Sequence, residues 1–132
     1  MAQSFTRAIC VLIVDDEDDS LDLLRLTLDR MGLEVLTAKS ASEALLVLAT
    51  EHVDLIVADL VMAGRTGVDL LREIRDLAIP APFIVVTAYG EMESYLEAMN
   101  LGAVDYLTKP INSELLTAVV SRTVASLLPI HA

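Results

Sequence analysis

The sequence predicts an α/β fold in which helices cover both faces of a doubly wound, five-stranded parallel sheet. Two observations support this fold class. Short runs of aliphatic and β-branched residues alternate along the whole chain with segments whose leucines recur at three- and four-residue steps. The short runs are apolar almost throughout, as expected for strands that are covered on both faces. Alternating units of this kind imply parallel strands joined by right-handed helical crossovers.

Five strands are expected, of which the second and the fifth have the weakest patterns. They are residues 8–14, 34–37, 53–58, 83–86 and 103–107. Apolar residues at helical spacing follow each strand, in residues 21–31, 41–48, 70–74, 92–99 and 116–127. We expect Ser40 to cap the second helix, Asn112 or Ser113 to cap the fifth, and Asp18 or Asp19 to cap the first.

Composition limits the classes of protein that fit this chain. Its 132 residues indicate a single domain, residues 1–132. A formal charge of −11 opposes direct binding of nucleic acid and favours a cation or a basic partner surface. The apolar runs are too short to span a membrane, so no membrane partner is expected. The single cysteine, Cys10, suits a reducing compartment and predicts a cytoplasmic protein.

Polar residues stand where the predicted strands end. They are Asp15 and Asp16, then Asp59, then Thr87, and finally Lys109 with Pro110. Taken singly, each fits an ordinary cap or turn. Because functional crevices of such sheets lie at the carboxyl ends of the strands, these side chains should meet. Three neighbouring carboxylates need a cation to offset their repulsion, and oxygen ligands of this kind suit Mg²⁺.

Four motifs in order resemble the receiver domain of two-component response regulators. They are IVDD at 13–16, ADLVMAGRTG at 58–67, VVTA at 85–88 and DYLTKP at 105–110. The likeness runs from about residue 8 to about residue 127, and the spacing of Asp59, Thr87 and Lys109 agrees with it. The resemblance implies a CheY-like, flavodoxin-like (βα)5 fold with strand order 2-1-3-4-5.

The resemblance also implies the chemistry of the site. Asp59 would accept a phosphoryl group from a sensor histidine kinase or a histidine phosphotransfer protein. Asp16, Asp59 and the backbone carbonyl of Val61 would ligate Mg²⁺, or Mn²⁺ in its place, and Asp15 would act through a water. The chain would then be a signalling domain that catalyses only its own phosphorylation and dephosphorylation, not an enzyme acting on other substrates.

A second group of residues would convert phosphorylation into a change of shape. By the family pattern, Thr87 donates its hydroxyl to the phosphoryl group, Lys109 pairs with that group, and Tyr106 turns inward. The bond between Lys109 and Pro110 is expected to be cis. The fourth helix, fifth strand and fifth helix would form the surface that binds an output partner, a second copy of the chain included.

Two other readings remain open at this stage. Asp16 and Asp18 form a DxD motif after a strand, as in phosphatases of the haloacid dehalogenase type, with Asp16 as the nucleophile. The Gly-Thr pair usual after that motif is absent, since Asp19 and Ser20 stand there. The other reading is a scaffold with the receiver fold that acts without phosphorylation. Whether the receiver stands alone or belongs to a longer regulator is left open too.

Overall fold

The protein is described here by a computed structural model that covers residues 8–62, 64, 66–88 and 92–127. Its strands are β1 (Cys10–Val14), β2 (Glu34–Ala38), β3 (Leu55–Asp59), β4 (Phe83–Thr87) and β5 (Asp105–Thr108). Its helices are α1 (Asp18–Arg30), α2 (Ala41–Thr50), α3 (Gly67–Asp76), α4 (Met92–Asn100) and α5 (Ser113–Leu127). All ten predicted elements are present, and the strand ends lie within two residues of the predicted ones.

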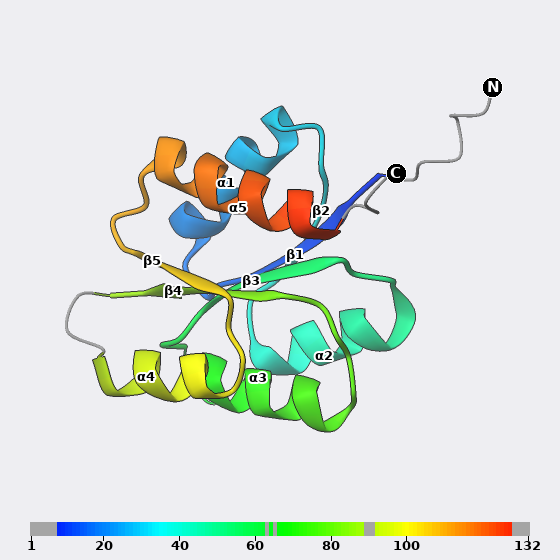
Figure 1. Cartoon of the computed structure of the whole chain (residues 1–132), viewed down its shortest axis with the longest axis vertical. Coiled ribbons are helices and arrows are strands. Elements are labelled where there is room, and N and C mark those ends of the chain that lie inside the picture. Colours follow the sequence, from blue (N-terminus) through cyan, green and yellow to red (C-terminus); the bar gives the residue numbers. More distant parts are fainter. Residues whose placement is uncertain (1–7, 63, 65, 89–91, 128–132) are drawn as a thin grey trace.

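The five strands form one parallel sheet in the order β2-β1-β3-β4-β5, which confirms the predicted fold class and strand order. Figure 1 shows α1 and α5 on one face of the sheet and α2, α3 and α4 on the other. Every residue of β1, β3 and β4 is buried, whereas the edge strands β2 and β5 are only partly covered. Among the described residues, no helix is both long and apolar enough to cross a membrane.

The buried strands contribute side chains to two hydrophobic cores, one on each face of the sheet. In β1, Leu12 and Val14 pack toward α2, α3 and α4, and Val11 and Ile13 pack toward α1 and α5. This alternation follows from the two-residue period of a strand. Apolar residues on both faces of the central strands therefore fix the strands from both sides. Their carboxyl ends gain a rigid support on which polar side chains can be placed.

Two predicted helix caps are confirmed and one is wrong. The Ser40 hydroxyl accepts a hydrogen bond from the Glu43 backbone N–H, and Asn112 Oδ1 accepts one from Leu115 N–H. The first helix departs from the prediction, because its N-cap residue is Glu17 and neither Asp18 nor Asp19 caps it. Both aspartates instead lie in the first turn, where the positive end of the helix dipole favours acids.

The start of α3 lies against the end of β3. The Gly67 backbone N–H donates a hydrogen bond to the Leu60 carbonyl. A Cβ atom added at Gly67 would lie 2.2 Å from the Asp59 carbonyl oxygen, so only glycine allows this approach. Thr66 and Asp69 close a capping box around the same turn. Asp59 and Leu60 are therefore held closely against the first turn of α3.

Candidate functional site

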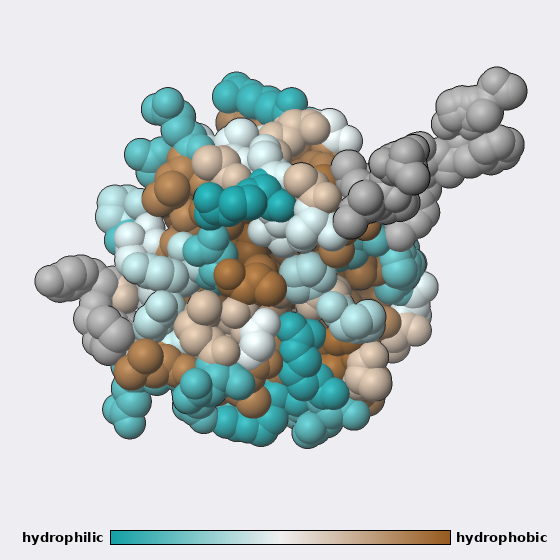
Figure 2. Space-filling view, in the orientation of Figure 1, coloured by the Kyte–Doolittle hydropathy of each residue, from teal (hydrophilic) through white to brown (hydrophobic). Residues whose placement is uncertain are grey.

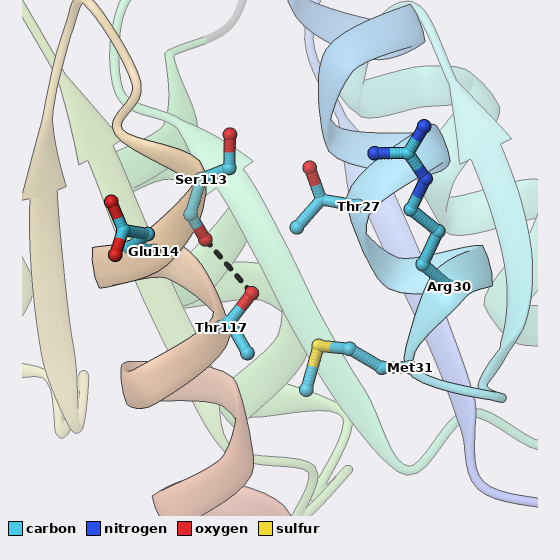
Figure 3. A pocket seen from close by; sticks show the side chains of 6 residues that line it. All are labelled: Thr27, Arg30, Met31, Ser113, Glu114 and Thr117. Carbon is cyan, nitrogen blue, oxygen red and sulfur yellow. Dashed lines mark hydrogen bonds between the residues drawn. The ribbon is translucent and has the colours of Figure 1, made fainter.

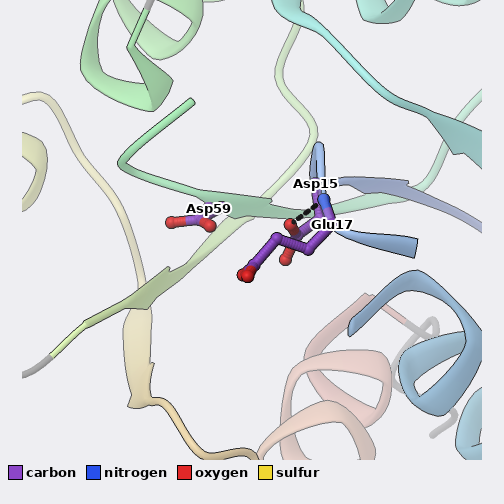
Figure 4. Close-up of side chains that lie close together, drawn as sticks. All are labelled: Asp15, Glu17 and Asp59. Atoms are coloured by element: carbon purple, nitrogen blue, oxygen red, sulfur yellow. Dashed lines mark hydrogen bonds between the residues drawn. The ribbon is translucent and has the colours of Figure 1, made fainter. Parts of the chain in front are cut away.

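Three carboxylates and one ammonium meet at the carboxyl ends of β1 and β3. Asp15, Glu17 and Asp59 each offer a carboxylate oxygen, and these oxygens all lie within 4.8 Å of one another (Figure 4). Lys109 Nζ lies 2.5 Å from Glu17 Oε1, 2.8 Å from Asp59 Oδ2 and 3.0 Å from Asp15 Oδ2. We call these four side chains the carboxylate cluster. It forms because β1 and β3 are neighbours in the sheet and the loop after β5 brings Lys109 across.

Asp59 is the buried acid at the end of β3, and its side chain is held at both oxygens. Oδ1 accepts a hydrogen bond from Val61 N–H at 2.9 Å, and Oδ2 accepts one from Lys109 Nζ. Burial raises the pKa of Asp59 above its ordinary value, and the bonds from Lys109 and Val61 oppose that rise. Asp59 is thus the kind of desolvated, positioned carboxylate that chemistry at a site requires.

Lys109 supplies the positive charge that this group of acids needs. Burial works to lower the pKa of Lys109, but its hydrogen bonds and ion pairs with Asp59, Glu17 and Asp15 outweigh burial and raise that pKa. The lysine is therefore ionised at neutral pH. Three carboxylates around one ammonium still leave the cluster with excess negative charge, which favours a further cation.

Asp15 provides a test of whether a metal ion would fit. It is completely buried, and its Oδ1 accepts a hydrogen bond from Glu17 N–H. Its Oδ2 has no hydrogen-bond partner among the described residues, although Lys109 lies close enough for an ion pair. A buried oxygen that shares one ammonium with two other carboxylates belongs to a donor set that suits a hard cation such as Mg²⁺.

A surface pocket of about 530 Å³ opens over the cluster. The residues that line it are Asp16, Glu17, Asp59, Val61, Met62, Ala88 and Lys109. Of the predicted metal ligands, Asp59, Asp16 and Val61 thus border one pocket, and Asp16 is exposed there. Sequence reasoning missed Glu17, since it assigned the acids after Asp16 to capping. The available signal was the unbroken run of acids directly after the strand.

Thr87, at the end of β4, and Tyr106, within β5, make contacts outside the carboxylate cluster. Thr87 is buried, and its hydroxyl donates a hydrogen bond at 3.2 Å to the Ala88 carbonyl. Tyr106 is 44% exposed, and its ring lies against that of Tyr95 in α4, with centroids 4.6 Å apart and planes inclined by 59°. The peptide bond between Lys109 and Pro110 is cis.

A second groove lies between α1 and α5, away from the cluster (Figure 3). It is lined by Thr27, Arg30, Met31, Ser113, Glu114 and Thr117. Its hydroxyls serve their own helices: Thr27 donates to the Leu23 carbonyl, and Thr117 donates to the Ser113 carbonyl. With no group of converging acids or bases in it, this groove is a weaker candidate for chemistry than the pocket over Asp59.

A doubly wound domain with acids and a lysine gathered at this edge of its sheet has the features of a signalling receiver. A family model described as the response regulator receiver domain matches residues 11–121. The chain therefore belongs to the receiver domains of two-component response regulators, and it is a signalling domain rather than a conventional enzyme.

Known bacterial proteins of this family are similar in sequence. The response regulator protein PilR of Pseudomonas aeruginosa is 40% identical over 76% of the chain. The alkaline phosphatase synthesis transcriptional regulatory protein PhoP of Bacillus subtilis is 36% identical over 77% of the chain. The matched region is only 23% of PilR and 42% of PhoP, so the chain spans less than half the length of these relatives.

Solved structures agree with the family. The crystal structure of FixJ-N has a TM-score of 0.84 and 33% identity, covering 95% of the chain and 100% of that structure. A CheY-like receiver domain protein from Methanospirillum hungatei has a TM-score of 0.86 and 29% identity, covering 92% and 97%. The chain thus shares its fold with whole receiver domains.

Proposed function

We propose that this receiver accepts a phosphoryl group on Asp59 from a sensor histidine kinase or a histidine phosphotransfer protein, with Mg²⁺ or Mn²⁺ bound beside it. The observation that carries the proposal is the contact of Lys109 Nζ with Oδ2 of the buried Asp59, beside the carboxylates of Asp15 and Glu17. One side chain offers a nucleophilic oxygen, and the other offers charge to neutralise an incoming phosphoryl group. Asp59 ends a fully buried strand, and its contacts with Lys109 and Val61 hold its side chain in place, as positioning for phosphoryl transfer requires.

The residues of the site divide the work of the reaction. A carboxylate oxygen of Asp59 forms a bond to phosphorus as the bond from phosphorus to the donor nitrogen breaks. Val61 N–H orients the Asp59 carboxylate during this step. Asp15, Asp16, Asp59 and the Val61 carbonyl would hold the metal, whose charge offsets that of the phosphoryl oxygens. Lys109 turns from Asp59 to a phosphoryl oxygen.

Phosphorylation would then act on the β4–β5 side of the sheet edge. The Thr87 hydroxyl donates a hydrogen bond at 3.2 Å to the adjacent Ala88 carbonyl, a contact that a phosphoryl oxygen can replace. Movement of Thr87 makes room for Tyr106, which now lies outside, to turn inward. This is a local charge event that biases an element with two positions.

The surface made by α4, β5 and α5 is the proposed output face. Leu96, Val104 and Tyr106 are about half exposed on it. Figure 2 shows hydrophobic residues interspersed with hydrophilic ones over this side of the molecule. A partner protein or a second copy of the chain would bind there in the cytoplasm, and the relatives that are called transcriptional regulators suggest gene control as one output.

Intact-mass measurement after incubation with acetyl phosphate and Mg²⁺ tests the phosphoacceptor. We expect one added phosphoryl group on the wild type and on Asp19→Asn, a control that removes an exposed acid outside the pocket. Asp59→Asn should gain none. A single, persistent phosphoryl group on Asp59→Asn would overturn the assignment.

Two further assays address the alternative readings. Asp16 is exposed at the rim of the pocket, whereas Asp59 is buried and paired with Lys109, which favours Asp59 over Asp16 as the nucleophile. Steady turnover of a small phosphate ester would support the phosphatase reading instead. Failure of beryllofluoride, a mimic of the phosphoryl group, to bind would support a scaffold that needs no phosphorylation.

A further inference from the structure

Glu17 occupies the N-cap position of α1 but does not cap the helix. Side chains that cap well are short, and Ser, Thr, Asp or Asn is favoured at this position. The Glu17 side chain makes no capping hydrogen bond. Its carboxylate instead reaches Lys109 Nζ at 2.5 Å and lines the pocket over Asp59. Glu17 therefore contributes no capping hydrogen bond to α1, and its contacts lie in the pocket over Asp59.

A cation already lies among the acids that Glu17 joins. Lys109 Nζ is within 3.0 Å of an oxygen from each of Asp15, Glu17 and Asp59. The ammonium thus marks a point at which three carboxylates can act together on one positive charge. Oδ2 of the fully buried Asp15 faces the same point, where the ammonium 3.0 Å away is shared with the other two carboxylates and no well-oriented hydrogen bond to Oδ2 is present among the described residues.

We infer that Glu17 is a further carboxylate of the divalent-cation site of this chain, beside Asp15, Asp16 and Asp59, and that Lys109 holds it when no metal is bound. The inference rests on the proposed function, because it concerns the metal that assists phosphorylation of Asp59. Glu17 adds a negative charge within reach of the cation, directly or through a water. With a cation in this site, Glu17 would face the cation in place of Lys109, and the lysine would be available to the phosphoryl group.

The charge balance explains why a third acid is useful here. A phosphoryl donor carries negative charge, so a pocket with three carboxylates and one ammonium repels it in the absence of metal. A divalent cation offsets that excess negative charge. Glu17 therefore makes phosphorylation depend more strictly on the metal than Asp15 and Asp59 alone would.

Titration with Mn²⁺, following free Mn²⁺ by electron paramagnetic resonance, tests the inference without any measurement of phosphorylation. Four variants are compared with the wild type at one ionic strength: Glu17→Gln, Asp16→Asn, Asp59→Asn and Asp19→Asn. Asp19→Asn is the matched control, since it removes an equal charge from the same run of acids at an exposed position that does not line the pocket. We expect Glu17→Gln to weaken Mn²⁺ binding about tenfold, and Asp19→Asn to change it by less than about twofold.

The outcomes separate this inference from the proposed function. Equal affinities for Glu17→Gln and Asp19→Asn, with loss of binding in Asp59→Asn, would overturn the role of Glu17 and leave the metal-assisted receiver standing. Absence of Mn²⁺ binding in the wild type would overturn both. A thermal melt of each variant verifies that it is folded. Weakening in Glu17→Gln that equals or exceeds that in Asp16→Asn would support Glu17 as a principal contributor to the site.

Discussion

The two halves of the sheet edge differ in how far their functional residues are already engaged. On the β1–β3 side, Asp15, Glu17 and Asp59 converge on Lys109 at distances of 2.5–3.0 Å. On the β4–β5 side, the Thr87 hydroxyl donates to the carbonyl of its neighbour Ala88, and the Tyr106 ring lies tilted against the Tyr95 ring of α4. The difference suggests that the groups for chemistry are assembled in advance and those for the response are not.

Position in the sheet accounts for the part of this difference that concerns Tyr106. β1 and β3 are central strands with every residue buried, so their ends move little and can hold charged groups in place. β5 is an edge strand whose residues alternate between exposed and covered positions. Tyr106 on that strand can exchange one environment for another at low cost. A switch at the edge of the sheet is therefore compatible with a rigid site near its centre.

Replacement of Lys109 by Met should cause the largest loss of stability, because it removes the positive charge from the carboxylate cluster on the β1–β3 side. Asp15 and Asp59 would remain as buried carboxylates without a positive charge, a situation that costs about 3–5 kcal/mol in comparable buried pairs. Thermal or urea unfolding at neutral pH measures the loss. Added Mg²⁺ should restore part of it, because the metal binds the folded state. The loss should also shrink as the pH falls and the carboxylates become protonated.

Lys39→Met is the matched control for that experiment. Lys39 pairs with Asp18 on the exposed surface, outside the pocket, so its removal should leave the unfolding curve unchanged. A loss of stability in Lys109→Met no larger than that in Lys39→Met would show that the cluster is not held by the lysine.

Gly67→Ala should disturb the same half through the backbone. The new Cβ would lie 2.2 Å from the Asp59 carbonyl oxygen and 2.8 Å from the Leu60 Cα. Both are backbone atoms, so the chain around Asp59 or the start of α3 must shift. Overpacking of this kind costs about 1–3 kcal/mol or more, and phosphorylation of Asp59 should slow as well. Gly32→Ala is the control, since its positive φ is strained but no atom lies within 4 Å of the added Cβ. A slower reaction in Gly32→Ala would contradict the steric account.

Asp59→Asn should make the metal-free protein more stable at neutral pH. Burial raises the folded-state pKa of Asp59 above the ordinary value of 3.8, so ionised Asp59 disfavours folding above that raised pKa. Asparagine removes this penalty and keeps an acceptor oxygen for Val61 N–H. We expect a melting temperature a few degrees above that of the wild type at pH 7. The difference should vanish as the pH falls below the ordinary value, and a constant difference at all pH values would contradict the electrostatic origin.

The sequence predicted the scaffold of the site better than its contacts. The change from apolar to polar residues marks where each strand ends. The sequence alone therefore places four residues at one edge of the sheet: Asp15, Asp59, Thr87 and Lys109. Which acid of the run reaches Lys109 depends on the turn that Asp15 forms with Glu17 N–H, and no propensity encodes that choice. The contact between rings of α4 and β5 depends likewise on how two elements pack.

Tyr95 should determine how easily Tyr106, on the β4–β5 side, turns inward when a phosphoryl mimic binds. Its ring supports Tyr106 in the outward position, and such aromatic pairs contribute about 0.5–1.5 kcal/mol beyond the area they bury. Tyr95→Leu keeps an apolar side chain in α4 but removes the ring, so the outward position loses that support. Because the mimic favours the inward position, beryllofluoride should bind about two- to tenfold more tightly to this variant.

The sequence has three tyrosines and no tryptophan, so fluorotyrosine NMR can follow Tyr106 directly once single substitutions have assigned the signals. In Tyr95→Leu without ligand, the Tyr106 signal should move toward its beryllofluoride-bound position, whereas Tyr95→Phe should behave as wild type. If both variants bind beryllofluoride as the wild type does, the ring pair does not restrain Tyr106.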